Sequence, residues 1–283
     1  MHLSRSQTER IAFILIGLAA ILTAAPIIIV VSAIFISGAS AISWQFLLEM
    51  PSNGMRSGGI WPAIVGTAYL VLGTGLISVP LGLGAAIYLS EYARDSSWTR
   101  AIRLAIINLA GIPSVVYGLF GLGLFVLFLK LGSSIAAACL TLSIMTLPVI
   151  ISTAEEALRA VPQSFRVVSI GMGGTRWQTI HRIVLPQALP GILTGVILGL
   201  NRAAGETAPI LFTGAAFFLP QLPSSIFDQT MALPYHLFVI STQVPGMPLQ
   251  IQYGTAAVLL TFVLGMNILA ASVRSWQRRK RQW

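Results

Sequence analysis

The stretch GMGGTRWQTIHRIVLP, residues 171–186, lies in the charged interruption between two groups of long apolar runs. Thr175 and Gln178 have the T-x-x-Q spacing of a capping box, in which each side chain satisfies the other residue's backbone N–H. They predict a short helix that runs to Leu185. Pro186 lacks a backbone N–H, so regular hydrogen bonding should break there. The stretch therefore predicts a folded helical connection.

The residues just before this stretch predict another short helix. Ser164 can cap a helix that reaches Ile170, and three glycines tolerate the positive φ that ends it. These are Gly171, Gly173 and Gly174. Phe165, Val168 and Met172 recur at three- and four-residue spacing, so the helix has an apolar stripe. The stripe packs against the chain's own bundle or lies in a partner's groove.

Composition outside this region is that of a membrane protein. Of the 283 residues, 55% are hydrophobic and only 9% are charged, far from the balance of soluble domains. Runs of 20 or more apolar residues can cross the hydrocarbon core. We predict an all-α integral membrane protein with six transmembrane helices in one domain, 1–283, with spans at 11–36, 61–90, 104–129, 131–154, 189–214 and 251–273. The first run exceeds the apolar length of a signal peptide, so we interpret it as an uncleaved helix.

The positions of the basic residues set the orientation. Only Arg56 and Lys130 fall in one set of alternate loops, Arg202 lies within a span, and the other Lys and Arg residues lie in the opposite set of loops and the termini. The positive-inside rule then places both termini in the cytoplasm. It makes the segment 154–191 the longest cytoplasmic connection. The basic tail 274–283 is expected to contact anionic lipid headgroups.

Several function classes are disfavoured. The net charge of +9 is explained by orientation, so a nucleic-acid role is not expected. The three histidines and the single cysteine, Cys139, form no cluster with metal-ligand spacing, so no metal site is assigned. No nucleophile, base and orienting residue are placed together, which disfavours an intramembrane enzyme. A G-x-x-x-x-G-K-[ST] loop is missing, so ATP and Mg²⁺ would have to bind a partner ATPase.

The stretch LNRAAGETAPILFTG, residues 200–214, puts two charges inside the fifth span. Arg202 lies eleven residues past Gly191, about 16 Å at 1.5 Å per residue, near the bilayer midplane. A central Arg costs roughly 2.5–3.5 kcal/mol to insert, so it should face the bundle interior or a cavity. Glu206 is a counter-charge at i+4, although Arg before Glu is the less favoured order. The pair either fixes helix packing or binds an oxyanion through the guanidinium fork.

Neighbouring residues extend this candidate pathway. Gly205 should permit close helix approach, and Pro209 removes a backbone donor, so the helix should open locally. Thr207 could then point at a substrate. Ser114 and Tyr117 offer hydroxyls where the third span should be kinked, and ordinary interhelical hydrogen bonding would explain them equally well.

Gly173, followed nine residues later by Ile183-x-Leu185-Pro186, resembles the loop of binding-protein-dependent ABC importer permeases, which docks on the ATPase subunit. The resemblance implies a MetI-like fold and ATPase contact by the stripe and by these loop residues. The chain departs from the family's Glu-Ala-Ala triplet, whose positions are occupied by Val167, Val168 and Ser169.

Two further segments, NLAGIPSVVYGLFGLG (108–123) and LNRAAGETAPILFTG, resemble the PstA family of phosphate importer permeases. The resemblance implies a heterodimer with a PstC-like permease in the bacterial plasma membrane, a PstB-like ATPase dimer and a PstS-like phosphate-binding protein. It places the family's intramembrane Arg and Glu on Arg202 and Glu206. A further family arginine would fall on Ser152.

We therefore expect a permease subunit, without a nucleotide site of its own, that translocates inorganic phosphate by alternating access. The alternative is an ion-coupled oxyanion transporter or channel that needs no ATPase. Glu206 is expected to accept a hydrogen bond from protonated phosphate, which fully ionised sulfate cannot donate.

Overall fold

The computed structural model describes residues 5–279, and its regular structure is helical apart from one two-stranded hairpin. In chain order the elements are α1 (Arg5–Gly38), α2 (Trp44–Leu48), β1 (Pro51–Ser52), β2 (Ser57–Gly58), α3 (Trp61–Ile87), the π-helical turn η1 (Tyr88–Tyr92), α4 (Ser97–Ala110), α5 (Ser114–Gly121), the π-helical turn η2 (Leu122–Phe128), α6 (Ile135–Arg159), α7 (Gln163–Gly171), α8 (Arg176–Thr179), the π-helical turn η3 (Ile180–Val184), α9 (Leu185–Gly205), α10 (Ala208–Thr213), α11 (Leu233–Thr242) and α12 (Leu249–Arg279). The hairpin strands are antiparallel, with Pro51 opposite Gly58. The charged side chains of the basic tail, predicted to contact lipid, lie outside the described residues.

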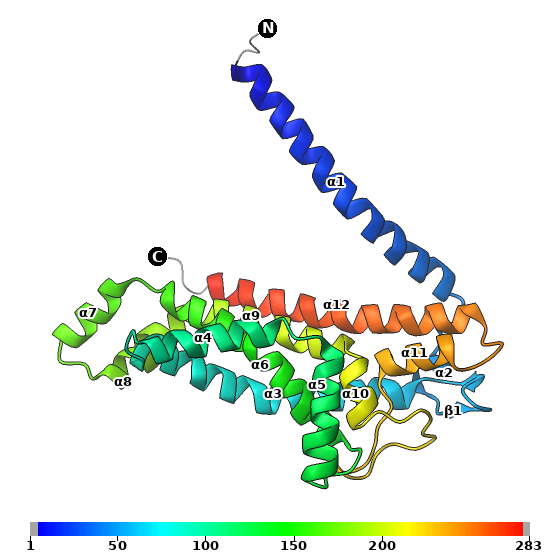
Figure 1. Cartoon of the computed structure of the whole chain (residues 1–283). Coiled ribbons are helices and arrows are strands. Elements are labelled where there is room, and N and C mark those ends of the chain that lie inside the picture. Colours follow the sequence, from blue (N-terminus) through cyan, green and yellow to red (C-terminus); the bar gives the residue numbers. More distant parts are fainter. Residues whose placement is uncertain (1–4, 280–283) are drawn as a thin grey trace.

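The long helices form a bundle with two distinct ends. Helices α3, α6, α9 and α12 lie side by side, and α6 is the most buried of the spans (Figure 1). Helices α7 and α8 lie at one end, called the loop end here, and α2, the hairpin and α11 lie at the opposite end (Figure 1). Helix α1 projects away from the bundle and approaches α12 where Gly38 meets the backbone of Tyr253.

The described residues contain five helical spans that are long and apolar enough to cross a membrane, and a sixth if a bent helix pair is counted as one span. The five are Phe13–Gly38, Trp61–Tyr92, Ile135–Arg159, Arg176–Gly205 and Leu249–Ser272. The prediction of an all-α membrane protein with about six spans is confirmed.

The bent pair occupies the span that we predicted at 104–129. Helix α4 begins earlier, at Ser97, and α5 leaves it at an angle of 101°. Pro113, which precedes α5, has an extended backbone and no N–H to continue the ladder. The hydroxyl of Tyr117 donates a hydrogen bond of 2.7 Å to the carbonyl of Leu109 across the bend. The expected kink is therefore a sharp turn.

Helix α9 packs closely on α6 through glycines one turn apart. A Cβ atom on Gly191, Gly195 or Gly199 would meet, respectively, Ala157, Thr153 and Ile150 of α6. Apolar burial adds little between helices in lipid, because the acyl chains are equally apolar, so close van der Waals contact has to hold the pair together. These glycines fix the height of Arg202, three residues beyond Gly199.

The connection at the loop end is shorter than the predicted segment 154–191. Helix α6 continues to Arg159 and α9 begins at Leu185, so the loop spans residues 160–184. The predicted cap at Ser164 is wrong: Pro162 is the N-cap of α7, because proline suits an end where no N–H is needed. Gly173 has the positive φ of +87° that was expected at this helix end.

The second predicted helix start is confirmed. The Thr175 hydroxyl accepts a hydrogen bond from the Gln178 N–H, and the Gln178 side chain accepts one from the Thr175 N–H. The break expected at Pro186 is a widened turn: the Leu185 N–H reaches five residues back to the Ile180 carbonyl, and the helix then continues as α9.

Candidate functional site

The fifth apolar segment, predicted as one span at 189–214, is interrupted in the structure. Helix α9 ends at Gly205, and Glu206 has extended backbone angles, φ −77° and ψ 132°. Helix α10 then starts with Pro209 in its first turn. Pro209 has no N–H with which to reach the Gly205 carbonyl, so the ladder stops there. The local opening inferred from the sequence is thus present.

Arg202 and Glu206 form a weak pair beside this break. The distance from Arg202 Nε to Glu206 Oε1 is 3.4 Å, long for a charge-assisted hydrogen bond. The Arg202 side chain is 32% exposed and that of Glu206 is 17% exposed. No other hydrogen-bond acceptor for the Arg202 guanidinium is found among the described residues. The other guanidinium donors are therefore open to a ligand.

Gly205 does not have the role that we predicted for it. A Cβ atom at this position would meet nothing within 4 Å, so Gly205 does not bring another helix of this chain close. The close approach occurs instead at Gly118 of α5, where a Cβ atom would meet Phe212 and the backbone of Ala208 and Pro209. Gly118 thereby seats α5 against the beginning of α10.

The hydroxyls of the candidate pathway fall into two groups. Tyr117 is buried within electrostatic reach of Arg202, but its proton is donated to Leu109, so here it braces the bend in the chain. Ser114 begins α5, and Thr207 stands in the break before α10. Neither of these two side chains makes a hydrogen bond within the part of the chain that is described. Ser114 and Thr207 are the hydroxyls free to donate.

A polar contact near Arg202 was not predicted from the sequence. Asn201 of α9 donates a 2.5 Å hydrogen bond from Nδ2 to Oδ1 of Asn267 on α12. Both residues lie in apolar runs, and an amide within a span is the signal that could have identified them. The contact holds α12 to the turn that carries Arg202.

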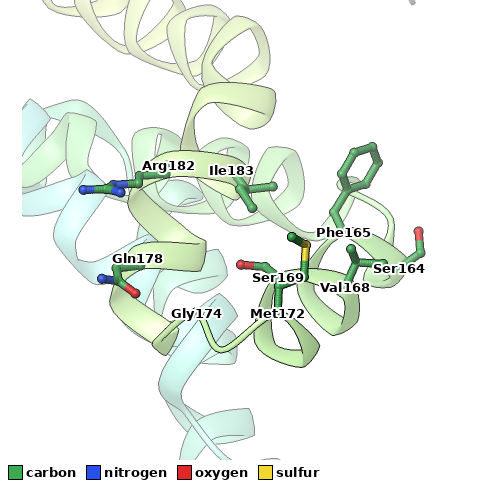
Figure 2. A pocket seen from close by; sticks show the side chains of 9 residues that line it. All are labelled: Ser164, Phe165, Val168, Ser169, Met172, Gly174, Gln178, Arg182 and Ile183. Carbon is green, nitrogen blue, oxygen red and sulfur yellow. The ribbon is translucent and has the colours of Figure 1, made fainter.

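The predicted apolar stripe lines a groove at the loop end. The groove, of about 500 Å³, lies between α7 on one side and α8 with η3 on the other (Figure 2). Phe165, Val168 and Met172 all lie along it, and Met172 is 85% exposed. Its other lining residues are Ser164, Ser169, Gly174, Gln178, Arg182 and Ile183. The stripe is therefore open to a partner, and we call this surface the docking groove.

The remaining loop residues are separated by the structure. Ile183 lines the docking groove, whereas Leu185 packs into a cluster of bundle side chains and Pro186 lies in the first turn of α9. Gly173, at the turn between α7 and α8, has open space around its α-carbon. Of this set, only Ile183 presents its side chain to the groove.

Two ion-pair groups at the loop end were also missed. Glu155 of α6 accepts a hydrogen bond from Arg103 of α4 at 2.8 Å and forms an ion pair with Arg159 at 2.9 Å. Glu91 of η1 pairs with Arg166 of α7 at 2.6 Å. The partners of the pairs across elements are 52 and 75 residues apart in sequence, so no local pattern could have shown them.

Comparison with known proteins agrees with this arrangement. The family model described as "Binding-protein-dependent transport system inner membrane component" matches residues 78–282. The chain is 34% identical over 282 residues to "Probable ABC transporter permease protein YqgI" of Bacillus subtilis, covering 95% of each chain. It is 33% identical to "Phosphate transport system permease protein PstA 1" of Mycobacterium tuberculosis, covering 84% of this chain and 77% of that one.

Solved structures support the fold. A chain of the MetNI methionine ABC transporter superposes with a TM-score of 0.62 at 16% identity, covering 80% of this chain and 99% of that one. A chain of a bacterial alginate ABC transporter gives 0.62 at 15% identity, covering 95% and 96%. With an apolar bundle, an exposed loop between α6 and α9 and the family model across residues 78–282, the chain belongs to the inner membrane components of binding-protein-dependent transport systems.

Proposed function

We propose that this chain is a permease subunit of an ATP-driven importer that passes inorganic phosphate across the membrane by alternating access. Relatives named as phosphate transport permeases, at 32–35% identity over most of the chain, support the substrate class. The chain itself supplies no nucleotide site, and ATP with Mg²⁺ belongs to a PstB-like ATPase dimer bound at the docking groove.

The observation that carries the proposal is the state of Arg202. It lies inside a bundle that crosses the membrane, beside a helix break, and makes only one long hydrogen bond to described residues. A guanidinium keeps its charge in such surroundings and offers paired donors that match phosphate oxygens. Thr207 adds a hydroxyl within the break, and Ser114 adds one at the start of α5, the helix whose Gly118 packs against the beginning of α10. This set can attract an oxyanion without enclosing it, as a passage requires.

Glu206 has two tasks in this scheme. Its carboxylate competes with the passing anion for Arg202, so that the anion is held briefly and released. It also accepts a hydrogen bond from a phosphate that retains a proton, whereas sulfate has no proton to donate at neutral pH. The same carboxylate therefore favours release and excludes sulfate.

The partners follow from the family. A PstC-like permease completes the translocation path, and a PstS-like protein delivers phosphate on the side opposite the loop. We place the complex in the bacterial plasma membrane, with both termini and the loop in the cytoplasm, on the distribution of basic residues. ATP-driven closure of the ATPase dimer would move α7 and rock the helices around Arg202.

Uptake of labelled phosphate into vesicles that contain the whole complex tests the proposal, with sulfate and molybdate as competitors. Arg202→Ala is expected to abolish uptake while the subunits still copurify. Arg100→Ala, which removes an exposed arginine of α4, is the matched control and should transport normally. Normal uptake by Arg202→Ala, or transport by the chain without any ATPase, would overturn the proposal.

A further inference from the structure

Helix α7 is poorly anchored in the bundle for a helix that a partner is expected to move. None of its residues, all of which the structure describes, is buried. The Ser169 hydroxyl is 2.8 Å from that of Thr179, but Thr179 belongs to α8 in the same loop. Buried apolar packing of α7 therefore provides no tight link to α3 and α6, and a polar connection supplies one.

Arg166 is that connection. Its side chain is only 12% exposed, although it projects from an otherwise exposed helix. Nη1 of the guanidinium donates to the carbonyl of Val161 at 2.8 Å, just past α6, and Nη2 donates to the carbonyl of Leu158 at 2.9 Å, in the last turn of α6. The Leu158 carbonyl also accepts from the Val161 N–H at 3.3 Å, so Arg166 adds a second donor where the last turn of α6 ends.

The edge of the guanidinium that carries Nε and Nη2 binds Glu91. Arg166 Nε donates to Oε2 at 3.0 Å, and Nη2 donates to Oε1 at 2.6 Å, which is the planar bidentate arrangement. The Glu91 side chain is 8% exposed and also accepts from the Ser90 hydroxyl. Glu91 lies in η1, where a π-helical turn ends the long span of α3 and changes the direction in which the carboxylate projects.

We propose that the Glu91–Arg166 pair is the positioning contact through which movement of α7 reaches the membrane spans. Arg166 ties three elements together: α7 itself, the end of α6 and the end of α3. The inference rests on the proposed function, because it presumes that an ATPase moves α7.

Both tied spans continue to the candidate pathway. On α3, a Cβ atom at Gly75 would meet Leu200 of α9, two residues before Arg202. On α6, Ile150 and Thr153 lie against Gly199 and Gly195 of α9. A displacement delivered by Arg166 to α3 and α6 thus reaches the helix that carries Arg202 from two sides.

The experiment measures ATP hydrolysis and phosphate uptake together in vesicles that contain the whole complex. Glu91→Gln removes the charge but keeps the size, Arg166→Lys keeps the charge but loses the fork, and the double exchange Glu91→Arg with Arg166→Glu restores a pair in reverse. Arg100→Ala serves again as the control. We expect Glu91→Gln and Arg166→Lys to keep hydrolysis within about twofold while uptake falls about tenfold, with the double exchange recovering part of the uptake.

The outcomes separate two failures. Unaltered complex that hydrolyses ATP but takes up no phosphate would refute the proposed function. The positioning role alone would be refuted if the unaltered complex takes up phosphate but the single variants do not uncouple it. Their uptake and ATP hydrolysis would then either fall in proportion or not fall at all. If Glu91→Gln fails to assemble, Arg166→Lys decides, since it preserves a positive group beside the carboxylate.

Discussion

Replacing Glu206 by glutamine is the sharpest perturbation of the candidate pathway. The change keeps the shape of the side chain and deletes the negative charge that lies 3.4 Å from Arg202. Two unit charges about 4 Å apart interact by about 4 kcal/mol at an effective dielectric constant of 20. Because the Arg202 side chain is about a third exposed, solvent screens the pair, and a discounted value of about 1–2 kcal/mol is appropriate.

Removing this attraction makes Arg202 more available to the transported anion. With the competing carboxylate removed, phosphate should be held roughly 5- to 30-fold more tightly, since about 1.4 kcal/mol is a factor of ten. The apparent KM for phosphate should fall, and turnover should fall with it because release is slower. Sulfate has no proton to donate to Glu206, so the carboxylate repels it. Without that carboxylate, sulfate should become a competitor and a substrate.

The assay is paired uptake of labelled phosphate and labelled sulfate by the reconstituted complex. Glu156→Gln, at an exposed carboxylate of α6, is the matched control and should leave both activities unchanged. Transport of phosphate by Glu206→Gln with sulfate excluded as well as by the unaltered chain would refute the assigned role of Glu206.

Three further changes have defined outcomes. Arg202→Lys keeps the charge but loses the fork, and should reduce phosphate uptake about tenfold with normal subunit copurification. Gly173→Pro imposes a negative φ where the chain has +87°, and should lower the amount of ATPase that copurifies, whereas Gly171→Ala should not. Burial lowers the pKa of His236, on α11 outside the spans, to about 4. Because the pKa of His236 is about 6.5 in the unfolded chain, the unfolded state takes up a proton first as pH falls. The free energy of unfolding is therefore fully retained above pH 6.5 and decreases by about 3 kcal/mol as pH falls toward 4. Thermal unfolding of His236→Phe should therefore show a weaker loss of stability over that pH range.

Features written in a few adjacent residues could be predicted from the sequence. The capping box at Thr175 and Gln178, the positive φ of Gly173 and the opening before Pro209 each depend on the chemistry of a short segment. Backbone hydrogen bonding within one turn decides these features, so tertiary contacts do not overrule them.

Features that depend on which segments meet could not be predicted. The Glu91–Arg166 pair joins residues 75 positions apart, and nothing local distinguishes either residue from an ordinary charged residue near a span. Gly205 looked like a packing glycine because small residues favour close helix contact, but the helix ends there and its neighbour in the structure is open space. The 101° turn before α5 needed more than a proline, since Pro148 lies inside α6 without breaking it.

The helical run that begins with α8 connects the loop directly to Arg202, so it can act as a lever between them. It extends from Arg176 to Gly205 and packs on α6 around Gly195. At 1.5 Å per residue, Arg176 is about 28 Å from that contact and Arg202 is about 10 Å beyond it. If the run pivots there as a rigid body, a shift of about 2 Å at the loop moves Arg202 by about 0.7 Å. Glu206 follows Gly205 directly and its N–H binds the Ala203 carbonyl, so it moves with the end of the run. Small loop movements are therefore sufficient to shift the Arg202–Glu206 pair as a unit relative to α6.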